Sequence, residues 1–150
     1  MEESNSEEVS EFLTKLLKLR WLSKKHLAEE LSDYQLTPSQ YITLRALEAY
    51  PQGLSMSDLA KTAHHVSATV SGIVDRMESQ ALVERFQNTG DRRRIQVKLT
   101  DHGINLLERI TAAKKVKFKQ ILDQLTPEQR VLLNTVIDMA STYLQSNLRG

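Results

Sequence analysis

Residues 54–103 decide the fold, and they read LSMSDLAKTAHHVSATVSGIVDRMESQALVERFQNTGDRRRIQVKLTDHG. Two helical patterns come first, over 56–63 and 67–80, and a short turn separates them. Two segments follow, over 82–86 and 94–99, in which apolar and polar residues alternate as they do in half-buried strands. A helix, a turn, a second helix and a hairpin in this order predict a mainly α-helical winged helix-turn-helix with a small β-hairpin wing.

The second predicted helix has two chemically different faces. Large apolar side chains gather on one face, and they are Val66, Val70, Ile73 and Met77. Small or polar residues and two charged ones lie on the other face: Ser67, Ala68, Ser71, Gly72, Asp75 and Arg76, with Thr69 at the edge. Small residues let a helix enter a major groove and hydroxyl groups can bond bases, so this face is predicted to contact DNA. The alternative is a plain exposed helix, although Lys, Glu and Ala would be more usual there.

The predicted hairpin connection, residues 87–93, is polar and basic. Four consecutive charged residues lie at its end: Asp91, Arg92 and Arg93 within the connection, and Arg94 directly after it. Because side chains alternate along a strand, the three arginines should not all point the same way. One is suited to a narrow minor groove, another can contact phosphate, and Asp91 can hold a guanidinium in a bidentate pair. The alternative is a solvated run of charges, which is the commoner fate of arginines in a loop.

Capping patterns predict helix starts on both sides of this segment. Thr37-Pro38-Ser39-Gln40 and Thr126-Pro127-Glu128-Gln129 both place a capping Thr before Pro, with Gln three residues after the cap. Thr100 is predicted to cap a third helix, and Ser55 to cap the first helix of the pair. The predicted flanking helices cover 9–31, 38–49, 101–124 and 127–147.

The predicted domain division follows from these helices. Residues 36–103 form the winged helix-turn-helix, and 9–35 with 104–150 form a helical dimerisation region. The long first and last helices exceed what an isolated winged domain needs, which favours dimerisation. Residues 1–8 are polar and acidic, so we expect a disordered N-terminus there.

Composition sets limits on function. The formal net charge of the 150 residues is only +1, yet residues 61–98 hold seven basic side chains against four acidic ones, a weak indication of a phosphate partner. The absence of cysteine excludes disulfides and thiolate metal sites. No apolar run approaches the roughly 20 residues that span a bilayer, and the acidic N-terminus is unlike a secretory signal. We therefore expect a cytoplasmic protein without a membrane partner.

Catalytic and metal sites are not expected. The chain has no acid–base pair, nucleophile motif or glycine-rich phosphate loop, so an enzyme with a cofactor is not predicted. The histidines, His26, His64, His65 and His102, have no carboxylate at a convincing ligand spacing, so no metal is predicted either. His65 precedes the second helix of the pair, and a contact with phosphate is the more natural role for it.

Four segments carry a resemblance to a known family: Leu59-Ala60 through Val70, Val74-Asp75-Arg76-Met77-Glu78, Leu82-Val83-Glu84-Arg85, and Asp91-Arg92-Arg93 with Leu99-Thr100-Asp101-His102-Gly103. In these the chain resembles the MarR family of bacterial transcription regulators. The resemblance covers the whole chain in helix order and residues 36–104 in motif detail. The D-R-R pattern, followed by L-T-x-x-G eight residues after Asp91, is the most specific part. The chain departs from the family at His64 and Ala81, where Gly is common, and at Val66, where a polar cap is common.

The resemblance implies a homodimer in which the N-terminal helix and the last two helices pack against those of the partner. The helix over 67–80 would read the major groove of double-stranded DNA, and Arg93 would reach the minor groove. The family binds pseudo-palindromic promoter sites, usually as repressors, and a small aromatic or anionic effector often releases the DNA.

The resemblance also implies an effector pocket between the dimer helices and the winged domain. Four residues come from the segments that line it: Trp21, Tyr34, Tyr41 and Arg45. Aromatic walls and an arginine facing a carboxylate would be sensible chemistry for such a ligand. The alternative is that each of the four is a packing or surface residue.

The modest charge also motivates a second hypothesis for the whole chain. A winged helix can serve as a protein–protein interaction module without sequence-specific DNA binding. Binding of duplex DNA with an affinity that falls steeply with salt, together with protection of a discrete palindrome, would exclude this alternative.

Overall fold

A computed structural model describes residues 2–65, 67–88 and 91–147, with the backbone alone for 2–5, 67, 88, 91–94, 144 and 147. The elements in chain order are α1 (Glu2–Ser32), α2 (Pro38–Glu48), β1 (Leu54–Ser55), α3 (Met56–Thr62), α4 (Ser67–Ser79), β2 (Val83–Asn88), β3 (Asp91–Leu99), α5 (Asp101–Leu122) and α6 (Pro127–Asn147). Two compact units cover the chain, Met1–Leu107 and Glu108–Gly150. The predicted class, mainly α-helical with a small hairpin, is confirmed.

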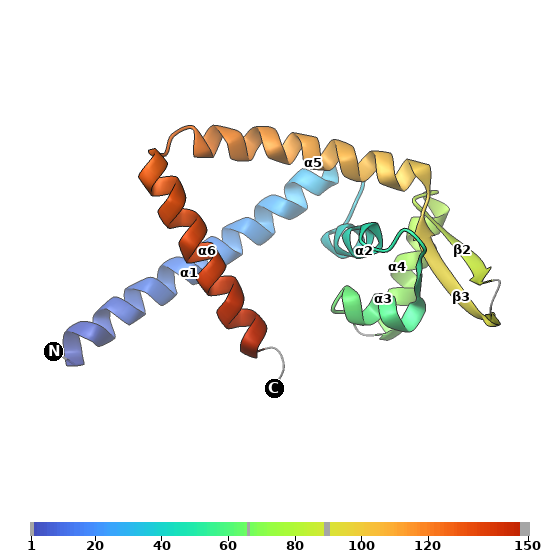
Figure 1. Cartoon of the computed structure of the whole chain (residues 1–150), viewed down its shortest axis with the longest axis horizontal. Helices are drawn as coiled ribbons and strands as arrows, with labels where there is room; N and C mark the ends of the chain where they lie inside the picture. Colours follow the sequence, from blue (N-terminus) through green and yellow to red (C-terminus); the bar gives the residue numbers. More distant parts are fainter. Residues whose placement is uncertain (1, 66, 89–90, 148–150) are drawn as a thin grey trace. The chain divides into compact units, whose positions relative to one another are not determined.

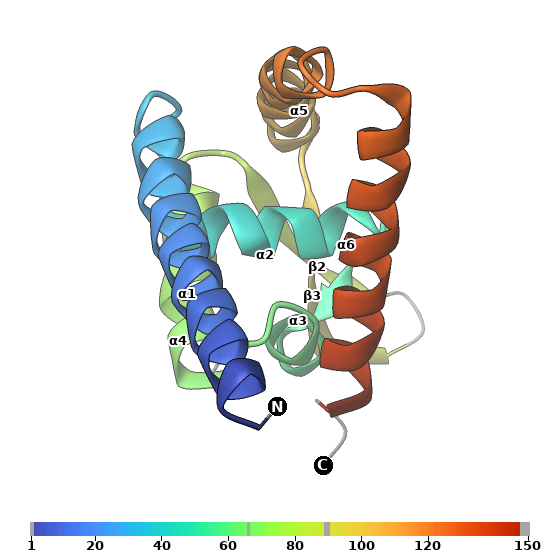
Figure 2. The same cartoon turned by 90° about the vertical axis from the view of Figure 1, so that its left-hand side faces the viewer.

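The hydrophobic core of the first unit lies where α2, α3, α4 and the sheet meet (Figures 1 and 2). Its largest fully buried side chains come from every one of these elements, from the end of α1, from the turn before β2 and from the first half of α5: Leu31, Leu44, Leu47, Leu59, Val70, Val74, Met77, Leu82, Val83, Val97 and Leu107. The apolar face predicted for α4 is buried at Val70, Ile73 and Met77, while Val66 lies outside the described residues. Helical periodicity in the sequence therefore located the inner face of α4 correctly.

The predicted helix caps are confirmed by their hydrogen bonds. Thr37 and Gln40 form a capping box, in which the Gln40 amide N–H donates to Thr37 Oγ1 over 3.2 Å and Thr37 N–H donates to Gln40 Oε1 over 2.8 Å. Thr126 and Gln129 repeat this arrangement at the start of α6. Ser55 accepts a hydrogen bond from the Asp58 amide at the start of α3. Each cap satisfies backbone donors that the first helical turn leaves free.

The sheet has three antiparallel strands in the order β1-β3-β2. The hairpin pairs Val83 with Leu99 and Arg85 with Val97, and β1 adds Leu54 opposite Val97. The sequence did not predict β1, because two residues are too short to display alternation.

The hairpin connection is shorter than the predicted 87–93. Both strands extend further, so β3 begins at Asp91, and Asn88 pairs with Asp91 while Gln87 pairs with Ile95. Arg92, Arg93 and Arg94 therefore occupy an irregular stretch of β3 opposite the step from Gln87 to Asn88. The expectation that side-chain alternation splits the three arginines stays a prediction, because their side chains lie outside the described residues.

Helix α1 begins at Glu2, which differs from the disordered N-terminus expected for residues 1–8. Negative charge near a helix N-terminus is favourable because of the helix dipole, and residues 2–8 supply four glutamates. The Ser10 hydroxyl also donates a hydrogen bond of 2.8 Å to the Ser6 carbonyl. Both features favour a helical conformation in this acidic segment.

Three helices end on a non-glycine residue with a left-handed backbone. Gln35, His64 and Ala81 have φ angles of 56°, 53° and 56°. At each end the next residue donates its N–H to a carbonyl five residues earlier, for example Leu82 to Met77 over 2.9 Å. This is the Schellman arrangement, in which glycine is usual because it lacks a Cβ atom. His64 and Ala81 are also the positions at which the sequence departs from the glycine of the MarR pattern.

Helices α1 and α6 and the second half of α5 expose many large apolar side chains. Examples are Phe12, Leu16 and Trp21 in α1, Phe118 and Ile121 in α5, and Leu132, Val136, Met139 and Tyr143 in α6. Within the part of the chain that the structure describes, no helix is long and apolar enough to cross a membrane.

Candidate nucleic-acid interface

The outward face of α4 is open and carries small side chains. Ala68, Thr69, Ser71, Gly72 and Arg76 are all exposed, and the Ser67 side chain lies outside the description. A Cβ atom added at Gly72 would meet no other atom within 4 Å. No carboxylate pairs with Arg76 among the described side chains, so its charge is available to a phosphate. This face is the one that the sequence predicted to contact DNA.

Amide side chains fix the C-terminal end of α4 against α2 and the turn that precedes it. The Gln40 side chain is buried and donates a hydrogen bond of 2.9 Å from Nε2 to Gln80 Oε1. Gln80 in turn donates from Nε2 to the backbone carbonyl of Gln35 over 3.2 Å. The same Gln40 completes the capping box of α2, so one residue orients α2 and α4 together. Hydrogen bonds that fix the orientation of a helix in this way suit a helix that must meet a partner at a defined angle.

Thr100 and Gly103 join the base of the wing to the end of α4. The Thr100 hydroxyl donates to the Ala81 carbonyl over 2.6 Å and accepts from the Gly103 amide over 3.0 Å. A Cβ atom at Gly103 would lie 2.1 Å from the Leu82 carbonyl oxygen, so only glycine fits. The L-T-x-x-G pattern is therefore explained by a cap and a close backbone approach.

Arg85 of β2 binds two carboxylates of α4. Its Nη2 lies 2.5 Å from Asp75 Oδ1, its Nη1 pairs with Glu78 Oε2, and its backbone N–H donates to Glu78 Oε1 over 3.3 Å. The hydrogen bond with Asp75 raises the pKa of Arg85 above its ordinary value, against the opposing effect of partial burial. Sequence reasoning missed this role, although two acids on one face of a helix followed by an arginine in the next strand were a usable signal.

The wing arginines are placed by their backbone only. Arg92, Arg93 and Arg94 lie in β3, and the side chains of Asp91–Arg94 fall outside the description. Their contacts with DNA and the pairing of Asp91 with a guanidinium therefore stay predictions.

His65 lies between α3 and α4 and is half-buried. Its Nε2 lies 3.4 Å from the backbone carbonyl of Ser39 in α2. One ring nitrogen thus faces the protein, and the predicted phosphate contact is left to the rest of the ring. No group of three or more histidine, aspartate and glutamate side chains could hold a metal ion within the described residues.

The four predicted effector residues lie in α1, α2 and the turn between them. Trp21 is exposed and carries Lys25 Nζ 5.6 Å from the centre of its ring. Tyr34 and Tyr41 are half-buried, and Arg45 pairs with Glu48 in the same helix.

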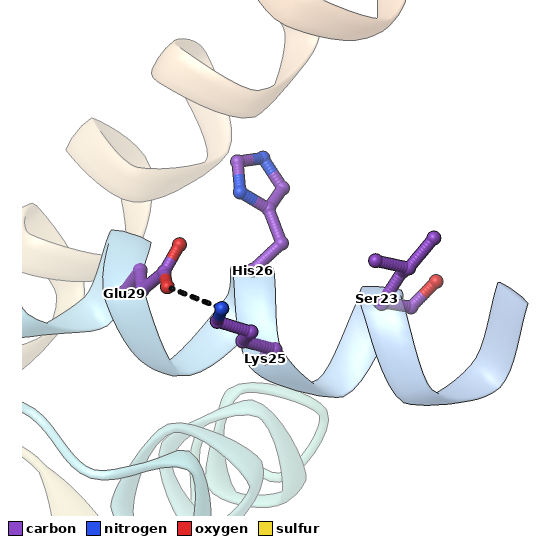
Figure 3. A pocket seen from close by; sticks show the side chains of 5 residues that line it. Ser23, Lys25, His26 and Glu29 are labelled. Atoms are coloured by element: carbon purple, nitrogen blue, oxygen red, sulfur yellow. Dashed lines mark ion pairs between the residues drawn. The ribbon is translucent and has the colours of Figure 1, made fainter. Parts of the chain in front are cut away.

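An open hollow lies along α1 next to Trp21, and its lining includes Leu22, Ser23, Lys25, His26 and Glu29. Figure 3 shows Ser23, His26 and Glu29 on one side of this helix, with Lys25 and Glu29 joined by an ion pair of 3.9 Å. The described lining of this hollow comes from one turn after another of α1 and contains none of the four predicted effector residues.

Comparisons with known proteins agree on one family. A sequence profile of the MarR family matches residues 34–94. The HTH-type transcriptional repressor NicR of Pseudomonas putida is 32% identical over 127 residues, which cover 80% of each chain. A point variant of MepR from Staphylococcus aureus, solved bound to an oligodeoxyribonucleotide, is 27% identical with a TM-score of 0.65, over 88% of this chain and 97% of that one.

The fold alone is shared more closely with a MarR family protein from Bacillus stearothermophilus. That structure has a TM-score of 0.80 at 22% identity, and the match covers 93% of this chain and 97% of the other. The winged helix-turn-helix, the profile match and the repressor relatives lead to one conclusion. The chain belongs to the MarR family of DNA-binding transcription regulators.

Proposed function

We propose that the protein is a homodimeric repressor that binds a pseudo-palindromic operator, with α4 in the major groove and a wing arginine in the minor groove. The open, small-residue face of α4 is the observation that carries the proposal. A groove about 12 Å wide admits a helix whose outward side chains are short. The relative NicR is a repressor, and the MepR variant was solved with DNA, which supports the same assignment.

The exposed apolar side chains of α1 and α6 support a homodimer. Trp21 is 61% exposed, Leu132 is 63% exposed and Met139 is 67% exposed. Apolar patches of this kind on a water-soluble protein usually mark an interaction surface. A second copy, related by a two-fold axis, would cover these apolar patches. The two copies of α4 would then face successive half-sites about one helical turn of DNA apart.

Selection of genomic fragments followed by footprinting tests the operator proposal. We expect protection of a discrete, nearly palindromic site by the purified protein. Arg93→Ala should cost about 1–3 kcal/mol of binding to that site. Lys115→Ala, which removes an exposed cation of α5, is the matched control and should leave affinity nearly unchanged. Equal affinities for Arg93→Ala and the parent would contradict the wing assignment, and binding without any protected site would contradict the operator.

We further propose that an aromatic carboxylate releases the DNA by binding near Trp21, Tyr34, Tyr41 and Arg45. A carboxylate that reaches Arg45 must compete with Glu48, because the two side chains already pair. Benzoate and the matched cation benzylamine can be titrated into the protein–operator complex. Benzoate should weaken binding, Arg45→Gln should abolish this response, and Glu48→Gln should strengthen it. An identical response in all three proteins would count against this site.

A further inference from the structure

Two carboxylates share the stripe of α4 that also carries Ser71. Asp75 and Glu78 follow Ser71 at spacings of four and seven, which places the three on one side of the helix. The Asp75 side chain is 62% exposed and that of Glu78 is 40% exposed. A helix that approaches the phosphate backbone with this stripe brings two negative charges towards a polyanion.

Arg85 is the group that offsets these charges. It comes from β2, it is only 25% exposed, and its guanidinium lies between both carboxylates. The five N–H donors of an arginine have the fork geometry needed to serve two carboxylates at once, and the guanidinium keeps its charge at any accessible pH. Arg76 has neither acid at a spacing of three or four, so it does not compete for them.

We infer that Arg85 is an electrostatic positioning residue for DNA binding: it masks Asp75 and Glu78 so that α4 can approach the phosphates, and it leaves Arg76 free to contact them. The inference rests on the proposed placement of α4 against DNA. It goes beyond that placement, because it assigns a function in DNA binding to a residue whose guanidinium pairs with carboxylates of the same protein.

A purely structural role makes a different prediction. If Arg85 only held β2 against α4, removal of the carboxylates would be as harmful as removal of the arginine. If Arg85 masks charge, removal of the carboxylates makes the arginine dispensable for binding. The salt dependence separates the two roles as well, because charge repulsion is screened by salt and misplacement of the wing is not.

The test measures affinity for a fluorescent mixed-sequence duplex over a range of salt concentrations, with the folded state checked by thermal unfolding. Arg85→Gln should weaken binding about tenfold at low salt, since the two unmasked carboxylates together add a repulsion of about that order. The deficit should shrink as salt rises. The triple variant Arg85→Gln, Asp75→Asn, Glu78→Gln should recover affinity to within about threefold of the parent. A triple variant no better than Arg85→Gln would overturn the inference.

A second variant keeps the test decisive if Arg85→Gln fails to fold. Asp75→Asn with Glu78→Gln retains Arg85, and it should bind the duplex more tightly than the parent because two negative charges are gone. Unchanged or weaker binding would overturn the inference. Arg76→Gln distinguishes the two levels of the proposal. If Arg76→Gln weakens DNA binding while the double variant binds like the parent, only the masking role fails. If both variants bind like the parent, the placement of α4 against DNA fails too.

Discussion

The winged helix-turn-helix and the flanking helices differ in the burial of their apolar side chains. Between Leu31 and Leu107 most large apolar side chains of α2, α3, α4 and the sheet are buried in one core. In α1 and α6 the residues of the same types are exposed, from Phe12 to Trp21 and from Val131 to Tyr143. Helices in water are stabilised mainly by packing of an apolar face, so the second pattern is the one that the proposed partner copy would complete. The winged region supplies its own core, and the flanking helices need another surface.

The largest expected effect concerns that missing surface. Leu132→Lys combined with Met139→Lys should convert a dimer to a monomer, because charges replace apolar side chains at the proposed interface. Loss of the second half-site contact should lower operator affinity about a hundredfold or more. Light scattering gives the mass and a binding titration gives the affinity. Asn134→Lys adds a charge at an exposed polar position of the same helix and is the control. A dimeric mass for the double variant would contradict the comparison.

Two glycines in helices give the next largest effect, with opposite signs. Gly103→Ala should destabilise the fold by about 2–4 kcal/mol, because its Cβ would lie 2.1 Å from the Leu82 carbonyl oxygen, and backbone cannot yield cheaply. Gly72→Ala should stabilise by about 0.5–1 kcal/mol, because its Cβ meets nothing within 4 Å and alanine favours helix. Chemical denaturation measures both. Equal effects would show that the base of the wing is looser than the structure indicates.

The smallest effect concerns the helix end before the wing. Ala81 has a φ of 56°, a conformation that costs an L-residue roughly 1–2 kcal/mol relative to glycine. Glycine loses more chain entropy on folding, which offsets part of this gain. Ala81→Gly should therefore stabilise by about 0.5–1 kcal/mol. Ala68→Gly, in the helical part of α4, should instead destabilise by about the same amount. If both variants melt below the parent, Ala81 is not strained.

Local patterns were enough to predict most elements of the winged region. The capping box at Thr37 and the buried face through Val70, Ile73 and Met77 depend on contacts within one helix or on simple periodicity. The family assignment and the expectation of a regulator rather than an enzyme are confirmed by membership of the MarR family.

Features that depend on two separated elements were not predictable in the same way. Strand β1 exists only because Leu54 lies opposite Val97, and the irregular register of Arg92–Arg94 depends on how β2 and β3 pair. The role of Arg85 likewise needs β2 to lie beside α4. Charge spacing along the chain suggests such a pair, but tertiary packing decides which residues meet.

The orientation of α4 towards DNA is the central claim, and thiol protection tests it most directly. The chain has no cysteine, so Gly72→Cys introduces a single reactive group at an exposed position with open space around it. Gln124→Cys, in the exposed turn between α5 and α6, is the matched control. Operator DNA should slow alkylation of Gly72→Cys to the rate at which the complex dissociates, and it should leave Gln124→Cys unaffected. Equal alkylation rates of Gly72→Cys with and without saturating DNA would contradict the account.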